Sequence, residues 1–263
     1  MDLGLQGRVA VVTGGSEGIG KAAAARMAAE GAHVFICARR EEVLAVAAND
    51  IRQQATGSVT PVVADVTDPA AVAALFRQAV DAHGGVDILV NNAGTAAAGR
   101  FQDIDDEAWY RDLELKLFGA IRCCREAIPL MKQRGGGRII NLTTPGGKAP
   151  PPGTLPTSVS RAAGISLTKA LSKEHAGDNI LVNAVCIGLI KSGQNDRRFE
   201  ARRKQEPALT REQFYADEGA DVPLGRVGES EEAGDVIAFL ASARASYVTG
   251  VTINVDGGKS PVI

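Results

Sequence analysis

The chain has 263 residues, of which 45% are hydrophobic and 23% are charged, a composition that is typical of a globular protein and excludes a disordered chain. Its formal net charge at pH 7 is −2, so no basic excess indicates a nucleic-acid partner. No run of about 18 apolar residues predicts a membrane-spanning helix. The first six residues lack the basic head and apolar run of a signal peptide.

Cysteine and histidine usage argues against a disulfide framework or a metal centre. Cys37, Cys123, Cys124 and Cys186 lie inside apolar segments, which is typical of buried, reduced thiols. We therefore expect a cytoplasmic protein. The three histidines share no spacing, so no structural metal site is predicted.

Short apolar runs alternate with longer Ala-, Leu- and Glu-rich stretches along the chain. The predicted strands are 9–13, 33–38, 59–64, 86–91, 138–143, 180–186 and 251–255. The clearest predicted helices are 20–30, 41–55, 69–83 and 157–175. Most strand segments are continuously apolar, as in strands that are buried on both faces. Because the alternation never resets, we expect a single α/β domain over 1–263, with three layers and a doubly wound parallel sheet.

Two segments interrupt this alternation. Residues 150–156 contain four prolines, which indicates a stiff loop beyond the fifth strand; its apolar residues favour a partly apolar ligand. Residues 191–222 carry charges of both signs and no strand pattern, and such a long insertion favours a substrate lid over a solvated surface excursion. The basic residues of this lid are Arg197, Arg198, Arg202, Arg203 and Lys204. They either receive an acidic group or, as we favour, pair with Glu200 and Glu206 in solvent.

The most informative motif runs from Thr13 to Gly20 and reads TGGSEGIG. It lies between the first predicted strand and the first predicted helix. Glycines at Gly14, Gly18 and Gly20 allow the backbone to turn tightly and to approach a pyrophosphate, while the helix N-terminus supplies free N–H groups. The alternative is a tight turn without a ligand. In this context the motif favours a dinucleotide-binding site.

The end of the second strand distinguishes the two nicotinamide dinucleotides. A carboxylate at this point holds the ribose hydroxyls of NAD, but here the position is Ala38, followed by Arg39 and Arg40. A guanidinium matches a phosphate in charge and geometry. NADP is therefore favoured over NAD, with Arg39 as the first phosphate ligand and Arg40 as the second. Alternatively, both arginines are solvated at the start of a helix.

The following strands end in further motifs that carry a family resemblance. Asp65-Val66 ends the third strand, where an adenine would lie, and the sequence NNAG at 91–94 ends the fourth. Together with the glycine motif and NVDGG at 254–258, they resemble the short-chain dehydrogenase/reductase family over essentially the whole chain. The resemblance implies a seven-stranded Rossmann-type sheet and a homodimer or homotetramer. It also implies a small-molecule substrate and nicotinamide-dependent reduction of a carbonyl or oxidation of an alcohol.

The resemblance also implies a full set of cofactor contacts. In the family a Pro-Gly-x-x-x-Thr segment after the sixth strand holds the nicotinamide carboxamide; here Ile187 replaces the proline and Ser192 keeps a hydroxyl. The predicted cofactor-binding residues are Gly14, Ser16, Gly18, Ile19, Gly20, Arg39, Arg40, Asp65, Val66, Asn92, Ala93, Gly94, Arg161, Gly188, Ile190 and Ser192.

The family's catalytic serine, tyrosine, lysine and asparagine are all replaced. Matching the motifs places Thr144, Thr157, Arg161 and Lys116, respectively, at these four positions. Tyrosine ionises near pH ~10 and can be tuned lower, whereas the aliphatic hydroxyl of Thr157 is far less acidic and cannot take the same role. Arg161 can hold the cofactor ribose but cannot relay a proton as lysine does. Thr144 keeps a hydroxyl that can donate to a developing oxyanion.

Another group would then have to supply the proton. Lys116, if desolvated beside Arg161, would have a lowered pKa and could act as the acid; the alternative is that it pairs with an acidic neighbour. Tyr215 could reach the site from the lid, and His175 is expected at the surface. The favoured function is an NADP(H)-dependent reductase of a ketone, enone or quinone with an altered proton donor. The alternatives are an NADP-binding scaffold or sensor without turnover, and a non-redox enzyme on the same fold.

Overall fold

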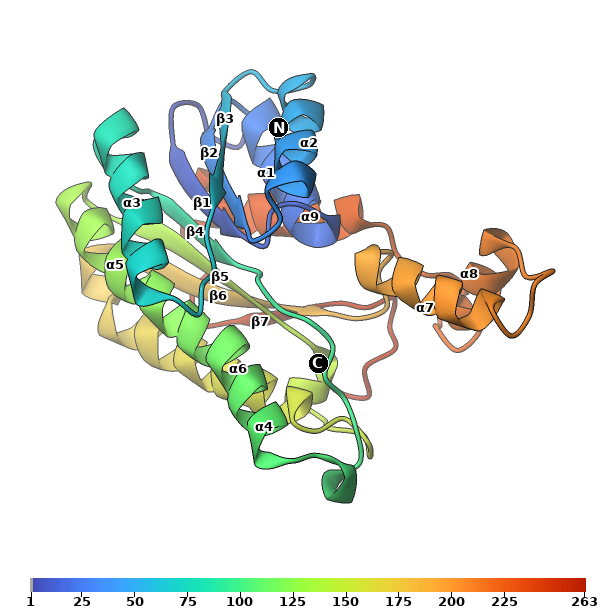
Figure 1. Cartoon of the computed structure of the whole chain (residues 1–263). Coiled ribbons are helices and arrows are strands. Elements are labelled where there is room, and N and C mark those ends of the chain that lie inside the picture. Colours follow the sequence, from blue (N-terminus) through green and yellow to red (C-terminus); the bar gives the residue numbers. More distant parts are fainter. Residues whose placement is uncertain (1) are drawn as a thin grey trace.

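A seven-stranded, all-parallel sheet forms the centre of the molecule (Figure 1), with the strand order β3-β2-β1-β4-β5-β6-β7. The computed structural model describes residues 2–263, except for the side chains of Gln194 and Arg197. The strands are β1 (Val9–Thr13), β2 (His33–Ala38), β3 (Ser58–Val63), β4 (Ile88–Asn91), β5 (Gly137–Thr143), β6 (Ile180–Ile187) and β7 (Thr252–Val255). The predicted α/β, doubly wound Rossmann-type fold is confirmed, with strand ends shifted by one or two residues.

Helices cover both faces of the sheet. They are α1 (Gly18–Ala29), α2 (Glu41–Arg52), α3 (Pro69–His83), α4 (Asp106–Leu113), α5 (Gly119–Gln133), α6 (Thr157–Glu174), α7 (Gly193–Arg203), α8 (Arg211–Gly219) and α9 (Ser230–Ala241). Helices α1, α2 and α9 share one apolar core with the sheet, and α3 and α5 share the other. Both faces of β1 are therefore covered, which explains why all five of its residues are buried. The four cysteines have free thiols and are buried, as predicted.

The sheet order reverses between β1 and β4, which places a crevice at the carboxyl ends of these strands. The glycine motif follows β1 and the NNAG motif follows β4, so the topology brings both to this crevice. A π-helical turn (Glu114–Phe118) joins α4 to α5. Helices α7 and α8 project away from the sheet (Figure 1) and form the segment predicted as a lid. No helix within residues 2–263 is long and apolar enough to cross a membrane.

Candidate cofactor and active site

The glycine loop has no room for side chains at its centre. Gly14 and Gly18 have φ values of 65° and 52°, which favour glycine. A Cβ atom on Gly20 would lie 2.4 Å from the Asn92 amide nitrogen and 2.4 Å from the Gly14 carbonyl oxygen. Glu17, which precedes α1, makes no side-chain capping bond among the described residues. The first N–H groups of α1 can therefore receive a phosphate.

Asn92 ties the end of β4 to this loop. Its side-chain amide donates to the carbonyls of Thr13 and Gly14, both at 3.0 Å. In return, the Thr13 hydroxyl accepts from the backbone N–H groups of Asn92 at 3.0 Å and Ala93 at 3.1 Å. The Asn92 side chain thus shapes the loop, and Ala93 and Gly94 follow it along the crevice.

The two arginines after β2 have different partners. The Arg39 guanidinium lies 3.8 Å from the Asp65 carboxylate, and 67% of its side chain is exposed. Arg40 donates to the Glu17 carboxylate. Asp65 also accepts from the backbone and hydroxyl of Thr67, both at 2.9 Å. Of the two arginines, Arg39 is therefore the one less engaged by neighbouring carboxylates.

The segment after β6 reaches the same loop. A Cβ atom on Gly18 would lie 3.2 Å from the Ser192 Cβ, so Ser192 lies directly against the glycine motif. Gly188 packs against Asp256, where a Cβ atom would come within 2.4 Å, and Ile190 pairs with Gly228. These contacts fix the position of the Ser192 hydroxyl, which donates to Asn195 at 3.1 Å.

Three of the four predicted catalytic residues lie together. The Lys116 ammonium, in the π-helical turn, donates to the Thr157 hydroxyl at 2.9 Å. Thr157 is the first residue of α6, and Arg161 lies one turn further along it. The Arg161 guanidinium donates to the Leu142 carbonyl at 2.8 Å, and a Cβ atom on Gly94 would lie 2.7 Å from it. The site therefore brings two cations to the loop after β4.

Thr144 joins this group from the end of β5. A short turn (Pro145–Gly147) follows it and packs onto α6, where a Cβ atom on Gly147 would lie 3.1 Å from the Arg161 Cβ. A Cβ atom on Gly146 would lie 3.6 Å from the Thr144 hydroxyl oxygen and 3.3 Å from that of Ser158. The Thr144 hydroxyl therefore lies near the first turn of α6.

Lys116 has the acidic neighbour that one interpretation of it predicts. It lies at the site, and it forms an ion pair with Asp112, with each side chain only 1% exposed. Burial lowers the pKa of Lys116, Asp112 opposes this effect, and the nearby charge of Arg161 lowers the pKa further. Burial also lowers the pKa of Arg161. The sequence interpretation missed Asp112, although its position four residues before Lys116 is a recognisable signal for a helical ion pair.

Other candidate groups have their own contacts. The Tyr215 ring in α8 lies 5.0 Å from the Lys191 ammonium, and burial raises its pKa. His175, expected at the surface, is buried because the turn after α6 folds back and places Asp178 at 3.0 Å from the ring; that prediction was wrong. Arg202, whose side chain is 34% exposed, pairs with Glu206 at 3.0 Å, as predicted, and also with Asp217 at 2.8 Å.

Comparisons with known proteins agree on one family. A family model described as enoyl-(acyl carrier protein) reductase matches residues 14–260. The granaticin polyketide synthase putative ketoacyl reductase 1 of Streptomyces violaceoruber is 39% identical over 254 residues, covering 95% of this chain and 92% of that protein. The 3-oxoacyl-[acyl-carrier-protein] reductase FabG of Thermotoga maritima is 35% identical, with coverages of 97% and 98%.

Solved structures show the same likeness. The L-sorbose reductase of Gluconobacter frateurii, complexed with NADPH and L-sorbose, has a TM-score of 0.95 at 34% identity, and all of each chain is covered. An NADPH-bound short-chain oxidoreductase of Pseudomonas aeruginosa PAO1, described as containing an atypical catalytic center, has a TM-score of 0.89 at 37% identity, with coverages of 97% and 98%. The chain belongs to the short-chain dehydrogenase/reductase family and is an oxidoreductase of that type.

Proposed function

We propose that this protein is an NADPH-dependent reductase of a small carbonyl compound, a ketone, enone or quinone, and that Lys116 supplies the proton through Thr157. The observation that carries the proposal is the 2.9 Å hydrogen bond from the buried Lys116 ammonium to the Thr157 hydroxyl. Thr157 occupies the position of the family's tyrosine, at the start of α6, and this places its shorter side chain on the side of the crevice where a substrate is expected.

The crevice fits the nicotinamide cofactor. The glycines of its loop pack too closely against their neighbours to carry side chains, and the first N–H groups of α1 are available to a pyrophosphate. Arg39, after β2, is exposed. Ser192 would hold the carboxamide, and Arg161 the ribose. The L-sorbose reductase with a TM-score of 0.95 is a complex with NADPH, which supports NADP as the form used here. When bound, NADPH supplies the hydride.

The side chains of the site can complete the reduction without tyrosine. The Thr157 oxygen accepts from Lys116 and, at 3.4 Å, from the backbone N–H of Ala97. Its own hydrogen is thus directed away from these donors and can pass to the substrate oxygen while Lys116 protonates Thr157. Lys116 itself is too buried to meet a substrate, whereas Thr157 is partly exposed. After transfer Lys116 is neutral, which removes one of the two buried positive charges.

One observation favours the alternative of a protein that binds NADP without turnover. The Asp112 carboxylate stabilises the charged form of Lys116 and so opposes proton release. Burial and Arg161 act in the opposite direction, and the pKa of Lys116 is lowered overall. The Pseudomonas aeruginosa relative that is described as containing an atypical catalytic center also binds NADPH.

The test is NADPH fluorescence with the purified protein, followed by a panel of ketones, enones and quinones, with NADH as the control. We expect a saturable fluorescence change that decays with one class of compound. Arg39→Ala should weaken NADPH binding about tenfold or more, the size of one charge-assisted contact, and leave NADH binding unchanged. Arg40→Ala, the matched control, should have a smaller effect because Arg40 is held by Glu17.

Two other outcomes would reject this function. A saturable signal that persists with every compound would indicate the binding protein. No saturable signal with either dinucleotide would exclude both of these functions and favour a non-redox enzyme on the same fold.

A further inference from the structure

The Asp112 carboxylate lies buried between α4 and α6, and its two oxygens have different donors. One oxygen accepts from the Lys116 ammonium. The other accepts from the Ser160 hydroxyl at 2.6 Å. The Ser160 hydroxyl is itself buried and lies 3.0 Å from the carbonyl oxygen of Thr157. Asp112 is thereby fixed to the same turn of α6 that carries the hydroxyl accepting from Lys116.

These contacts form a closed ring of which the ammonium is one member. Lys116 donates to Asp112 and to Thr157, Asp112 accepts from Ser160, and Ser160 and Thr157 share the first turn of α6. A lysine ammonium is a compact charge on a flexible four-carbon stem, and one partner alone leaves it several orientations. Two partners from different helical segments restrict it to one.

The charges around Lys116 point to the same role. Asp112 from α4 and Arg161 from α6 are the charged groups that act on the ammonium within the described residues. Gly94, the neighbour from the loop after β4, carries no charge. Without Asp112, Lys116 and Arg161 would be two like charges in a buried site, and the ammonium would be driven away from Arg161 and from Thr157.

We propose that Asp112 is a positioning residue: its carboxylate, anchored by Ser160, holds the Lys116 ammonium so that one of its N–H groups points at the Thr157 hydroxyl. The proposal rests on the function proposed above. It assigns no contact with substrate or cofactor to Asp112 or Ser160, whose effects pass through Lys116.

The experiment measures single-turnover NADPH decay against pH for the wild type, Asp112→Asn and Ser160→Ala. The carboxylate favours the charged form of Lys116, so D112N should move the alkaline limb of the rate profile to lower pH by about 1–3 units. Ser160→Ala keeps the charge and should lower the rate at every pH with little movement of the limb. The NADPH dissociation constant should not change in either variant. A uniform loss of rate in D112N with an unmoved limb would overturn the proposal.

Lys116→Met separates this proposal from the proposed function. If K116M keeps the wild-type rate and profile, Lys116 is not the proton donor and the proposed function fails in its mechanism. If K116M loses activity while the limb of D112N stays in place, the donor stands and the positioning role of Asp112 fails. Should D112N not fold, Asp112→Glu keeps the charge but moves it by one methylene. A reduced rate in D112E with unchanged NADPH binding supports positioning, and a wild-type rate contradicts it.

A direct titration gives an answer that does not depend on turnover. The protein is labelled with ¹³C at the lysine ε-carbon, and the resonance of Lys116 is identified by its absence in K116M. We expect the titration midpoint of Lys116 to be lower in D112N than in the wild type. Equal midpoints would show that Asp112 does not act on the ammonium.

Discussion

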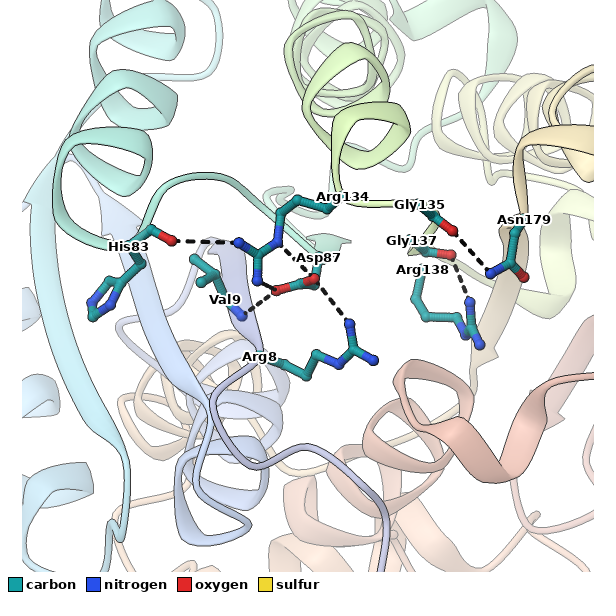
Figure 2. A network of polar contacts seen from close by, with 9 residues as sticks. All are labelled: Arg8, Val9, His83, Asp87, Arg134, Gly135, Gly137, Arg138 and Asn179. Carbon is teal, nitrogen blue, oxygen red and sulfur yellow. Dashed lines mark hydrogen bonds and ion pairs between the residues drawn. The ribbon is translucent and has the colours of Figure 1, made fainter.

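Two buried aspartates, Asp87 and Asp112, are both 3% exposed but differ in the kind of partner that surrounds them. Asp87 lies just before β4, at the edge of the sheet opposite the glycine loop. Its carboxylate accepts from the Val9 backbone at 2.8 Å, from Arg8 at 3.1 Å and twice from Arg134, at 2.9 Å and 3.0 Å. Figure 2 shows these residues gathered around Asp87. Asp112 instead accepts from a lysine and a serine.

The partners decide what each carboxylate can do. Burial raises the pKa of Asp87, but the hydrogen bonds from Arg134, Val9 and Arg8 outweigh it and hold the pKa below its usual value. An arginine does not release its proton, so the Asp87 cluster is a permanent connection between the starts of β1 and β4 and the end of α5. Lys116, which pairs with Asp112, has a lowered pKa and lies within hydrogen-bond distance of the Thr157 hydroxyl. A buried aspartate therefore has a structural role at Asp87. At Asp112, as we propose, it supports a proton relay.

The largest expected effect is on the rate of NADPH oxidation, and it concerns proton transfer from Lys116 to Thr157. Lys116→Met should lower the rate of NADPH oxidation by about 10²- to 10⁴-fold, the usual contribution of acid catalysis, without changing the NADPH fluorescence titration. Thr157→Val should lose nearly as much, because Lys116 is too buried to meet the substrate. Thr157→Ser is the matched control and should keep most of the rate. Wild-type turnover in T157V would mean that the proton does not pass through Thr157.

The Asp87 cluster should contribute to the stability of the fold and not to turnover. Asp87→Ala leaves the Arg134 guanidinium without its carboxylate and should lower the free energy of unfolding by about 3 kcal/mol, the low end for a broken buried pair, because Arg134 is partly exposed. Urea unfolding measures this change. Asp50→Ala, which removes the exposed pair with Lys21, should have little or no effect and serves as the control. Equal effects of D87A and D50A would show that burial of Asp87 contributes nothing.

The fold and these side-chain contacts differ in how far the sequence predicts them. The parallel sheet and the place of the crevice follow from continuous apolar strands and the glycine motif, since parallel strands bring their carboxyl ends to one edge. The positions of Thr157, Arg161 and Lys116 follow from the family's motif spacing. The Asp87–Arg134 contact joins residues 47 apart, and the Asp112–Ser160 contact joins residues 48 apart. No local pattern marks such pairs, because packing between separate elements creates them.

The smallest effect is a pH dependence that belongs to Asp87. Its folded pKa lies below the unfolded value of about 3.9, so between these two values the unfolded chain binds more protons. Its contribution to stability is therefore fully present above about pH 4 and is lost as the pH falls through the folded pKa. Asp87→Asn keeps the shape of the side chain but has no such titration. We expect the urea-midpoint difference between wild type and D87N to be constant near neutral pH and to shrink in acid. A difference that stays constant into strong acid would show that the Asp87 charge does not contribute, and Asp87 would then act through its shape and hydrogen bonds alone.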